Sequence, residues 1–264
     1  MKKILFALAS VVLLALASCF EDTGNRRESY HHRVVTVDTN SGSTKYIADY
    51  TGEVFKDADF TNLKTPEQVA QFGIADAKRA ELLIRLNVDN EYKQTITLES
   101  AQKIDVQPVT NITPTDSLLP FSSWMQKPLF DNYYSPIVWV AEGYLNVVPV
   151  IPSNGEGKYF LTAEKAVSDT LYLRLDATYT PNANKQGYID KLQCFDLRTL
   201  KDTVNADLEQ RAKMIEVLEA IKQHKNDSMR IILTGKFDWK KINGKDTIGD
   251  MRAITDYFKC GFIQ

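Results

Sequence analysis

The 264-residue chain is poor in the side chains that most often carry chemistry. Its three histidines are His31, His32 and His224, and only three cysteines are present. No CxxC or HExxH spacing occurs, so the sequence predicts no metal site. P-loop and dinucleotide-binding glycine patterns are also missing. A nucleophile–histidine site would have to use His224, which sits at the predicted end of a helix. We therefore predict no catalytic residue, no cofactor and no enzymatic activity.

An excess of positive charge is lacking as well. The formal net charge is −2, and removal of Lys2 and Lys3 with a leader peptide lowers it to −4. A mildly acidic surface does not attract phosphates, so no nucleic-acid partner is expected. The hydrophobic fraction of 44% is that of a globular protein.

Residues 1–18 have the three parts of a lipoprotein signal peptide. Lys2 and Lys3 form the basic region, and the apolar run 4–17 is too short to favour a membrane-spanning helix. Ala17 and Ser18 then place small residues before Cys19, whose thiol is the nucleophile for attachment of a diacylglyceryl group. We predict lipidation at Cys19 and membrane anchoring through acyl chains such as palmitate. The alternative is an ordinary signal peptide with an incidental cysteine.

Residues 19–32 are predicted to be a lipidated tether, because the segment 21–30 is polar and low in apolar content. Glu21 and Asp22 resemble the surface-export signal of Bacteroidota lipoproteins, with a solvated tether as the alternative. The expected location is the outer membrane, on either its periplasmic side or the cell surface.

Residues 33–110 read as five short strands with one helix, which favours a small OB-like barrel. The clearest alternation is Leu82, Ile84, Leu86 and Val88. The helix is expected at residues 65–72, where Thr65 can act as the N-cap, Pro66 occupies the first helical position and Gln68 completes a capping box.

Residues 111–136 are predicted to be a proline- and aromatic-rich connection that packs across the domain boundary. Residues 137–264 follow as a β-sandwich, with its clearest alternation at Leu171, Leu173 and Leu175. One helix, at 207–225, is inserted into this domain, with an apolar stripe predicted at Leu208, Ala212, Ile215 and Leu218 and with Ile221 beside it. That helix either packs on a sheet or binds a partner. The predicted fold class is therefore mainly β.

Two further cysteines, Cys194 and Cys260, alternate in phase with apolar neighbours and are expected to face inward. An exported protein can form disulfides, so a Cys194–Cys260 bridge and two buried thiols are both open.

The order of these segments resembles the NigD-like lipoproteins of Bacteroides and its relatives. The resemblance covers nearly the whole mature chain. Its pieces include Val34-Val35-Thr36-Val37-Asp38, the Asp-Tyr-Thr-Gly turn at 49–52, Gly143-Tyr144-Leu145-Asn146 and Cys194-Phe195-Asp196-Leu197. It implies an OB-like barrel followed by a β-sandwich, and it suggests a link to bacteriocin loci and immunity. The connection 111–135 and the helix 207–225 depart from the family pattern.

Aromatic residues cluster near the start of the second domain, at Trp124, Tyr133, Tyr134 and Trp139. Exposed rings of this kind could stack on sugars. Burial at the domain junction is the alternative, and we predict that Trp139 is mostly buried.

A recurrent pattern of Asp, then Ser or Thr, then an aliphatic residue or Met resembles the O-glycosylation signal of Bacteroides export. The hydroxyl positions are Ser117, Thr170, Thr203, Ser228 and Thr247. Asp and Ser or Thr also favour turns in their own right.

Three functions follow as hypotheses. The first is a non-enzymatic envelope lipoprotein that binds another protein, as an interaction or bacteriocin-immunity-type factor. The second is a glycan-binding accessory lipoprotein. The third is an unrecognised hydrolase.

Overall fold

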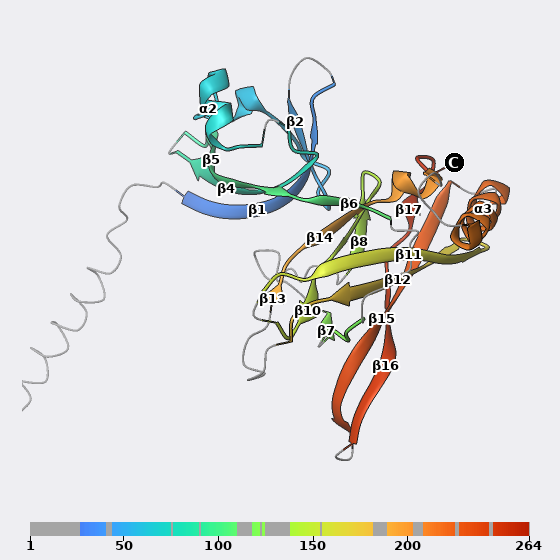
Figure 1. Ribbon diagram of the computed structural model, residues 1–264. Coiled ribbons are helices and arrows are strands. Elements are labelled where there is room, and N and C mark those ends of the chain that lie inside the picture. The colour runs from blue at the N-terminus through green and yellow to red at the C-terminus, as the bar shows by residue number, and fades with distance from the viewer. Residues whose placement is uncertain are drawn as a thin grey trace, which may run out of the picture.

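The computed structural model describes residues 27–40, 44–74, 76–89, 91–109, 118–121, 123–124, 138–153, 155–181, 189–202, 208–224, 227–242 and 245–263. The fold is mainly β, which confirms the predicted class. Figure 1 shows a curled amino-terminal sheet joined by β6 to a larger group of sheets. In the described part of the chain, no helix combines the length and apolar character needed to cross a membrane. The leader and Cys19 lie outside the described residues.

The amino-terminal unit is a five-stranded antiparallel half-barrel with the order β3-β2-β1-β4-β5. Its strands are β1 (Arg27–Asp38), β2 (Lys45–Ala48), β3 (Val54–Lys56), β4 (Arg79–Val88) and β5 (Gln94–Ile104). Alternating residues of β4, among them Leu82 and Ile84, fill its core. β1 begins at Arg27, inside the segment 19–32 that the sequence assigns to a tether. Residues 27–32 pair with β4 from Val88 to Leu83. Alternation of apolar and polar residues does not reveal this strand, because its residues are polar.

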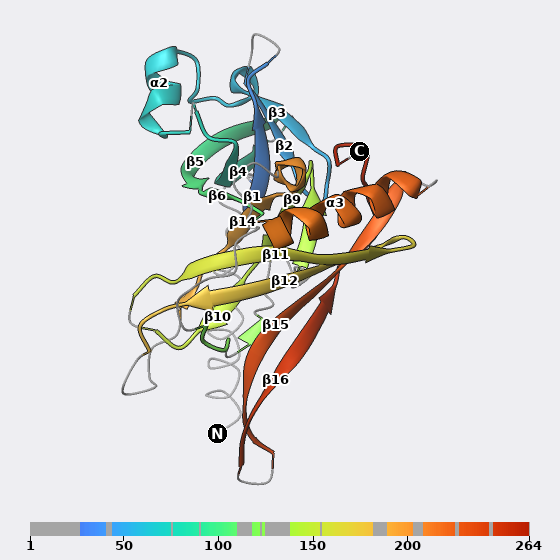
Figure 2. The same cartoon turned by 45° about the vertical axis from the view of Figure 1, so that its right-hand side comes forward.

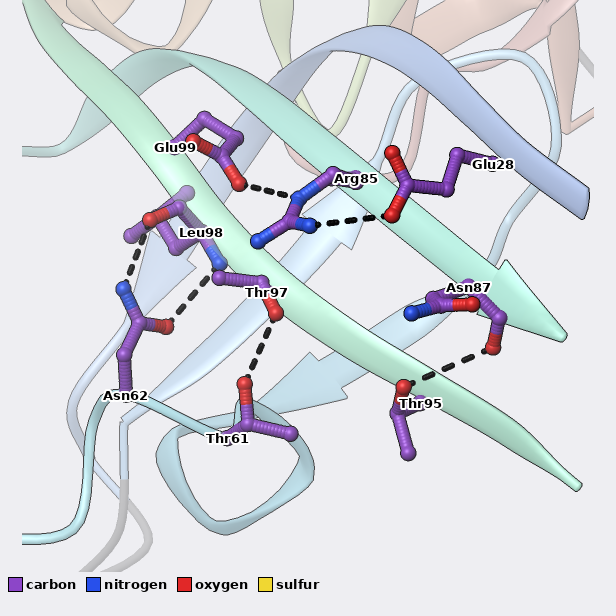
Figure 3. A network of polar contacts seen from close by, with 9 residues as sticks. All are labelled: Glu28, Thr61, Asn62, Arg85, Asn87, Thr95, Thr97, Leu98 and Glu99. Carbon is purple, nitrogen blue, oxygen red and sulfur yellow. Dashed lines mark hydrogen bonds and ion pairs between the residues drawn. The ribbon is translucent and has the colours of Figure 1, made fainter. Parts of the chain in front are cut away.

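The segment after β3 folds back and partly closes the half-barrel onto β5. It contains a 3-10 turn, η1 (Asp57–Asp59), and the helix α2 (Pro66–Gln71). Thr65 caps α2 and forms the predicted capping box with Gln68. Phe60 bridges to Ile96, and the amide of Asn62 pairs with both backbone groups of Leu98, at 2.7 and 3.0 Å (Figure 3). These contacts give β5 the partner that an edge strand otherwise lacks.

The outward face of the half-barrel has an ion network across three strands. Arg85 on β4 donates to Glu99 on β5 through Nε, at 2.5 Å, and contacts Glu28 on β1 at 3.4 Å (Figure 3). The β4–β5 register shifts between Leu83 and Ile84, which leaves Glu99 as the extra residue of a bulge. The bulge therefore places the Glu99 carboxylate against Arg85.

The second unit contains three sheets. One has the order β6-β14-β9-β8, formed by β6 (Val106–Pro108), β14 (Gln193–Asp196), β9 (Tyr144–Val147) and β8 (Val138–Ala141). Another has the order β11-β12-β15-β16, formed by β11 (Lys158–Val167), β12 (Thr170–Thr178), β15 (Ser228–Ile242) and β16 (Lys245–Ile254), with β17 (Phe258–Lys259) on β15. The third consists of β13 (Ile189–Asp190), β10 (Pro149–Ile151) and β7 (Ser123–Trp124). β12 and β15 run parallel, and β15–β16 extends away from the body as a long hairpin (Figures 1 and 2).

The large core of this unit lies between the first two sheets. Leu171, Leu173 and Leu175 of β12 are fully buried in it, as their alternation predicted. Phe121 is also buried there, and its N–H donates to the carbonyl of Lys236 at 2.8 Å. Residues 118–121 of the predicted connection therefore contact the second unit, and most of the rest of that connection lies outside the described residues.

The long helix α3 (Leu208–Gln223) lies along β11 and contacts the 3-10 helix η2 (Leu197–Lys201) (Figure 2). Its buried residues are Met214, Val217 and Ile221. The stripe predicted through Ala212 and Ile215 is wrong, because Ala212 is exposed and Ile215 is 46% exposed. Apolar residues occupy both adjacent helical faces here, so periodicity alone could not decide which one packs.

Candidate functional site

The two domains meet through one face of the sheet β6-β14-β9-β8. Strand register places Trp139, Asn146 and Cys194 in one row across β8, β9 and β14. These residues face the half-barrel, whereas Leu145 and Phe195, one position away, enter the main core. Both faces of this sheet are covered, which explains why all four residues of β9 and of β14 are buried.

Two tight turns bring the polar groups of this junction together. On the half-barrel side, β2 ends in the turn 49–52, where Gly52 adopts a φ of 65° and donates its N–H to the carbonyl of Ala48. On the other side, β8 and β9 are joined by Glu142 and Gly143, both at positive φ. Such two-residue turns match the twist of the strands they join, and glycine adopts them without strain.

A buried ion pair lies at the centre of the junction. Arg79 is the first residue of β4, and its guanidinium donates to both carboxylate oxygens of Asp49, at 2.6 and 2.5 Å. The Arg79 side chain is fully buried and that of Asp49 is 2% exposed. Arg79 also donates to the hydroxyl of Thr36, its register partner on β1, at 2.7 Å. Although burial works to lower the pKa of Arg79, the contacts with Asp49 outweigh it and hold that pKa above its ordinary value.

The second domain adds two hydrogen bonds to the same ion pair. Asn146 on β9 accepts from Nη2 of Arg79 at 3.0 Å. The indole Nε1 of Trp139 on β8 donates to Oδ2 of Asp49 at 2.7 Å. Charge-assisted hydrogen bonds of this kind stabilise a buried pair that would otherwise remain poorly solvated. The cluster of Thr36, Asp49, Arg79, Trp139 and Asn146, here called the junction cluster, therefore joins the domains directly.

Trp139 is 6% exposed, which confirms the prediction that it is mostly buried. Its ring lies 5.5 Å from that of Tyr50 in the 49–52 turn. Because the indole packs against the half-barrel, it cannot belong to an exposed sugar-stacking platform. Tyr133 and Tyr134, the other rings considered for that role, lie outside the described residues. The side chain of Trp124 is also outside the described part of the structure.

Tyr144 and Cys194 complete the junction. Tyr144 is 3% exposed, and the guanidinium carbons of Arg79 and Arg198 lie 5.2 and 4.2 Å from its ring centroid. Burial raises the pKa of the Cys194 thiol to about 11, although the positive charge of Arg79 opposes that rise. A thiol with so high a pKa is a poor nucleophile.

The charged groups of the junction cluster are bound to one another. The Arg79 guanidinium is already bound to Asp49, Thr36 and Asn146, and no solvent reaches it. Among the described residues, no group of three or more His, Cys, Asp or Glu side chains is arranged to hold a metal ion. Nε2 of His224 lies 3.1 Å from the carbonyl oxygen of Ser228. This hydrogen bond gives His224 a structural role at the end of α3.

An open groove of about 680 Å³ lies beside the junction cluster. We call it the interdomain groove. The half-barrel contributes residues 36–40, Ile47 and 76–78, and the second domain contributes Glu142, Tyr144, Asp196 and Arg198. Asp196 and Arg198 are paired with each other at 2.6 Å. Asp76, Lys78 and Glu142 are exposed, so both signs of charge are available to a ligand.

The predicted modification sites are placed as follows. Cys194 and Cys260 are buried, as their alternation predicted, and they are present as thiols without a bridge between them. Thr170 is 4% exposed and its hydroxyl bonds to Asp169, so a glycan there would require the strand end to open. Ser228 is half-buried at the start of β15. Cys19, Ser117 and Thr203 lie outside the described residues, as does the side chain of Thr247.

The sequence analysis identified some residues of the junction cluster but did not predict that they bind one another. Asp49 and Asn146 both stood in motifs that carried the family resemblance, whereas Arg79 did not. A charged residue at the start of a strand is usually exposed to solvent, so Arg79 gave no sign of burial. No local pattern links it to a carboxylate 30 residues earlier.

No family model matches the chain, and neither does any curated protein. Similar solved structures do exist. A candidate lipoprotein from Bacteroides fragilis is 11% identical, with a TM-score of 0.55, over 88% of this chain and 99% of that one. An uncharacterized protein from Parabacteroides merdae is 15% identical, with a TM-score of 0.47, over 86% and 98%. A NigD-like immunity protein from Bacteroides caccae is 15% identical, with a TM-score of 0.39, over 84% and 91%. The similarity to the Bacteroides fragilis structure covers most of this chain and supports the fold.

Proposed function

We propose that this protein is an outer-membrane lipoprotein, anchored through Cys19, that acts by binding another protein in the interdomain groove. It works as an interaction or bacteriocin-immunity-type factor and has no enzymatic role. The leader and Cys19 support the anchor, as does the fold similarity to a candidate lipoprotein.

The observation that carries this proposal is the groove formed by two domains that the junction cluster joins. A partner that binds there does not have to order the domains first, so less of its binding energy is lost. The hydrogen bonds from Asn146 and Trp139 reach the half-barrel pair directly. Thr36 belongs to both the groove and the junction cluster. It lines the groove, and its hydroxyl accepts a hydrogen bond from Arg79.

The character of the groove favours a protein partner. Pockets for small ligands are usually apolar and enclose most of the ligand. This groove is open and has the exposed charges of Asp76, Lys78 and Glu142 at its edges. Polar, charged and partly exposed surroundings are typical of the rim of protein–protein interfaces.

The test is site-specific photo-crosslinking in the native envelope. A photoreactive residue replaces Glu142 at the groove, and a matched one replaces Glu91, whose side chain is 72% exposed on the β4–β5 turn. We expect a discrete crosslinked product from position 142 that disappears when Asp76→Lys reverses a groove charge. Glu91→Lys serves as the control and should leave the product intact. Equal products from both positions, or none from position 142, would contradict the groove as the binding site.

A further inference from the structure

The outward face of the sheet β11-β12-β15-β16 is unlike the rest of the protein in charge. The inward positions of β12 are Leu171, Leu173 and Leu175, so the residues between them point to the other side of the sheet. Register then aligns Lys165, Tyr172, Ile232 and Ile254 in one row across all four strands. We call this side the outer sheet face.

Positive charge dominates this face. Among the residues whose side chains the structure describes, six cationic residues occupy its outward positions: Lys158, Lys165, Arg174, Arg230, Lys236 and Arg252. Among the residues whose side chains the structure describes, strand register places one acidic residue, Asp176, on this face, so positive charge predominates there. The whole chain carries −2, so the cations are concentrated here against the overall balance. A local field of this sign attracts acidic partners.

Exposed apolar side chains lie at one end of the same face. Ile254 is 60% exposed and Tyr257, just beyond the end of β16, is 57% exposed. Val167, at the end of β11, is 51% exposed. Single exposed apolar residues are ordinary, but several beside a charged surface are typical of a binding site.

Several of these side chains are already held in place. The Lys165 ammonium lies 4.8 Å from the Tyr172 ring centroid, and the Arg230 guanidinium lies 5.6 Å from that of Tyr257. Tyr257 donates its hydroxyl to Asp169 at 2.7 Å, and Arg230 donates through Nε to the Thr170 hydroxyl at 3.2 Å. Ordered side chains lose less entropy when a partner arrives.

We propose that the outer sheet face is a second interaction surface, which binds an acidic protein segment carrying aromatic or aliphatic side chains. Three of the six cations are arginines, whose planar guanidinium matches a carboxylate. Arg174 shows this chemistry within the chain, because its Nε contacts both oxygens of Asp176 at 3.2 and 3.3 Å. A flat sheet face with rows of arginine and apolar residues suits a protein surface better than a lipid bilayer, into which exposed side chains must penetrate. This surface is separate from the interdomain groove and does not depend on it.

The probe is a soluble acidic copolymer of Glu and Tyr, added to the full-length protein in detergent micelles. Lys165→Glu and Arg252→Glu reverse two exposed charges of the outer sheet face. The double variant Lys78→Glu/Lys93→Glu, with one change in the groove and one on the half-barrel turn, is the control with the same total charge change. Because all four side chains are exposed, the variants should keep the thermal midpoint of the original protein.

We expect the Lys165→Glu/Arg252→Glu double variant to bind the copolymer at least about tenfold more weakly, and the control double variant to stay within about twofold. Ile254→Ser, which changes no charge, should also weaken binding and should do so at high salt. Equal losses in the outer-face and control variants would overturn the proposal, since any reduction in charge would then suffice. In the second arm the copolymer is replaced by glycerophosphoglycerol, the water-soluble headgroup of phosphatidylglycerol. Tighter binding of this headgroup than of the copolymer, with the same sensitivity to the outer-face variants, would assign the surface to lipid instead. The crosslinking test at position 142 and the copolymer test are independent, because they concern different surfaces. Either test can fail while the other succeeds.

Discussion

Arg79 connects the two domains through a charge that no water reaches. Removing such a side chain leaves the Asp49 carboxylate buried without its partner, and that costs much more than the pair itself contributes. A hydrophobic pair of similar volume would often be as stable. We therefore assign the ion pair chiefly to specifying how the domains dock, because its partners Trp139 and Asn146 come from the second domain.

This assignment makes a testable prediction about stability. Arg79→Met should lower the free energy of unfolding by about 3–5 kcal/mol, because Asp49 is left as an uncompensated buried charge. The double variant Arg79→Met/Asp49→Leu should recover much of that loss. Urea unfolding curves of the single and double variants measure the difference. A double variant as unstable as the sum of the two single variants would contradict the explanation.

Cys194 predicts a loss of stability in alkaline solution. Burial raises its pKa to about 11 from an ordinary value of 9.0, so the unfolded chain releases this proton at a lower pH than the folded chain does. The contribution of the neutral thiol is complete below pH 9 and is lost as the pH rises toward 11. Two pKa units correspond to roughly 2–3 kcal/mol. Urea midpoints between pH 8 and 11 should fall more steeply for the original protein than for Cys194→Ala, and parallel slopes would exclude this thiol as the cause.

At the scale of elements, the β8–β9 hairpin does most to position the junction. The Glu142-Gly143 turn sets the register that pairs Trp139 with Asn146. Gly143 also lies close to the ring of Phe262, and a Cβ there would be 3.4 Å from it. The hairpin therefore depends on a residue that tolerates positive φ and a close neighbour.

Trp139→Ala should lower the free energy of unfolding by about 3–5 kcal/mol, through the cavity left by the indole and the loss of its bond to Asp49. Tyr92→Ala is the matched control, because that ring is 88% exposed and its loss should change stability by less than about 0.5 kcal/mol. Chemical unfolding of both variants provides the measurement. A small effect at Trp139 would mean that the junction is looser than its contacts indicate.

Strands with a single core face could be predicted from the sequence, and so could the α2 capping box. Period-two alternation identified β4 and β12 because each has one face in an apolar core. Alternation misses β1 from Arg27 to His32, where pairing with β4 holds polar residues in a strand. It also did not settle the face of α3, where Met214 and Val217 compete with Ile215. The junction was only partly predictable, since burial of Trp139 followed from its opposition to Val138 and Val140, whereas its partner Asp49 lies 90 residues away.

At the scale of the whole molecule, we propose a two-domain body carried on a lipid anchor. The interdomain groove needs both domains in fixed positions, and the outer sheet face needs only the second domain. Both surfaces would be presented at the membrane by residues that precede β1. The proposed location of the protein therefore depends on lipidation at Cys19.

The most direct test is metabolic labelling with an alkyne analogue of palmitate in cells that express the full chain or its Cys19→Ala variant. We predict that the original protein is labelled and is recovered from the outer-membrane fraction. The variant should carry no label and should accumulate with its leader uncleaved, because the thiol that accepts the diacylglyceryl group is gone. A Cys19→Ala protein that still incorporates palmitate, or an original protein that remains unlabelled, would contradict the account.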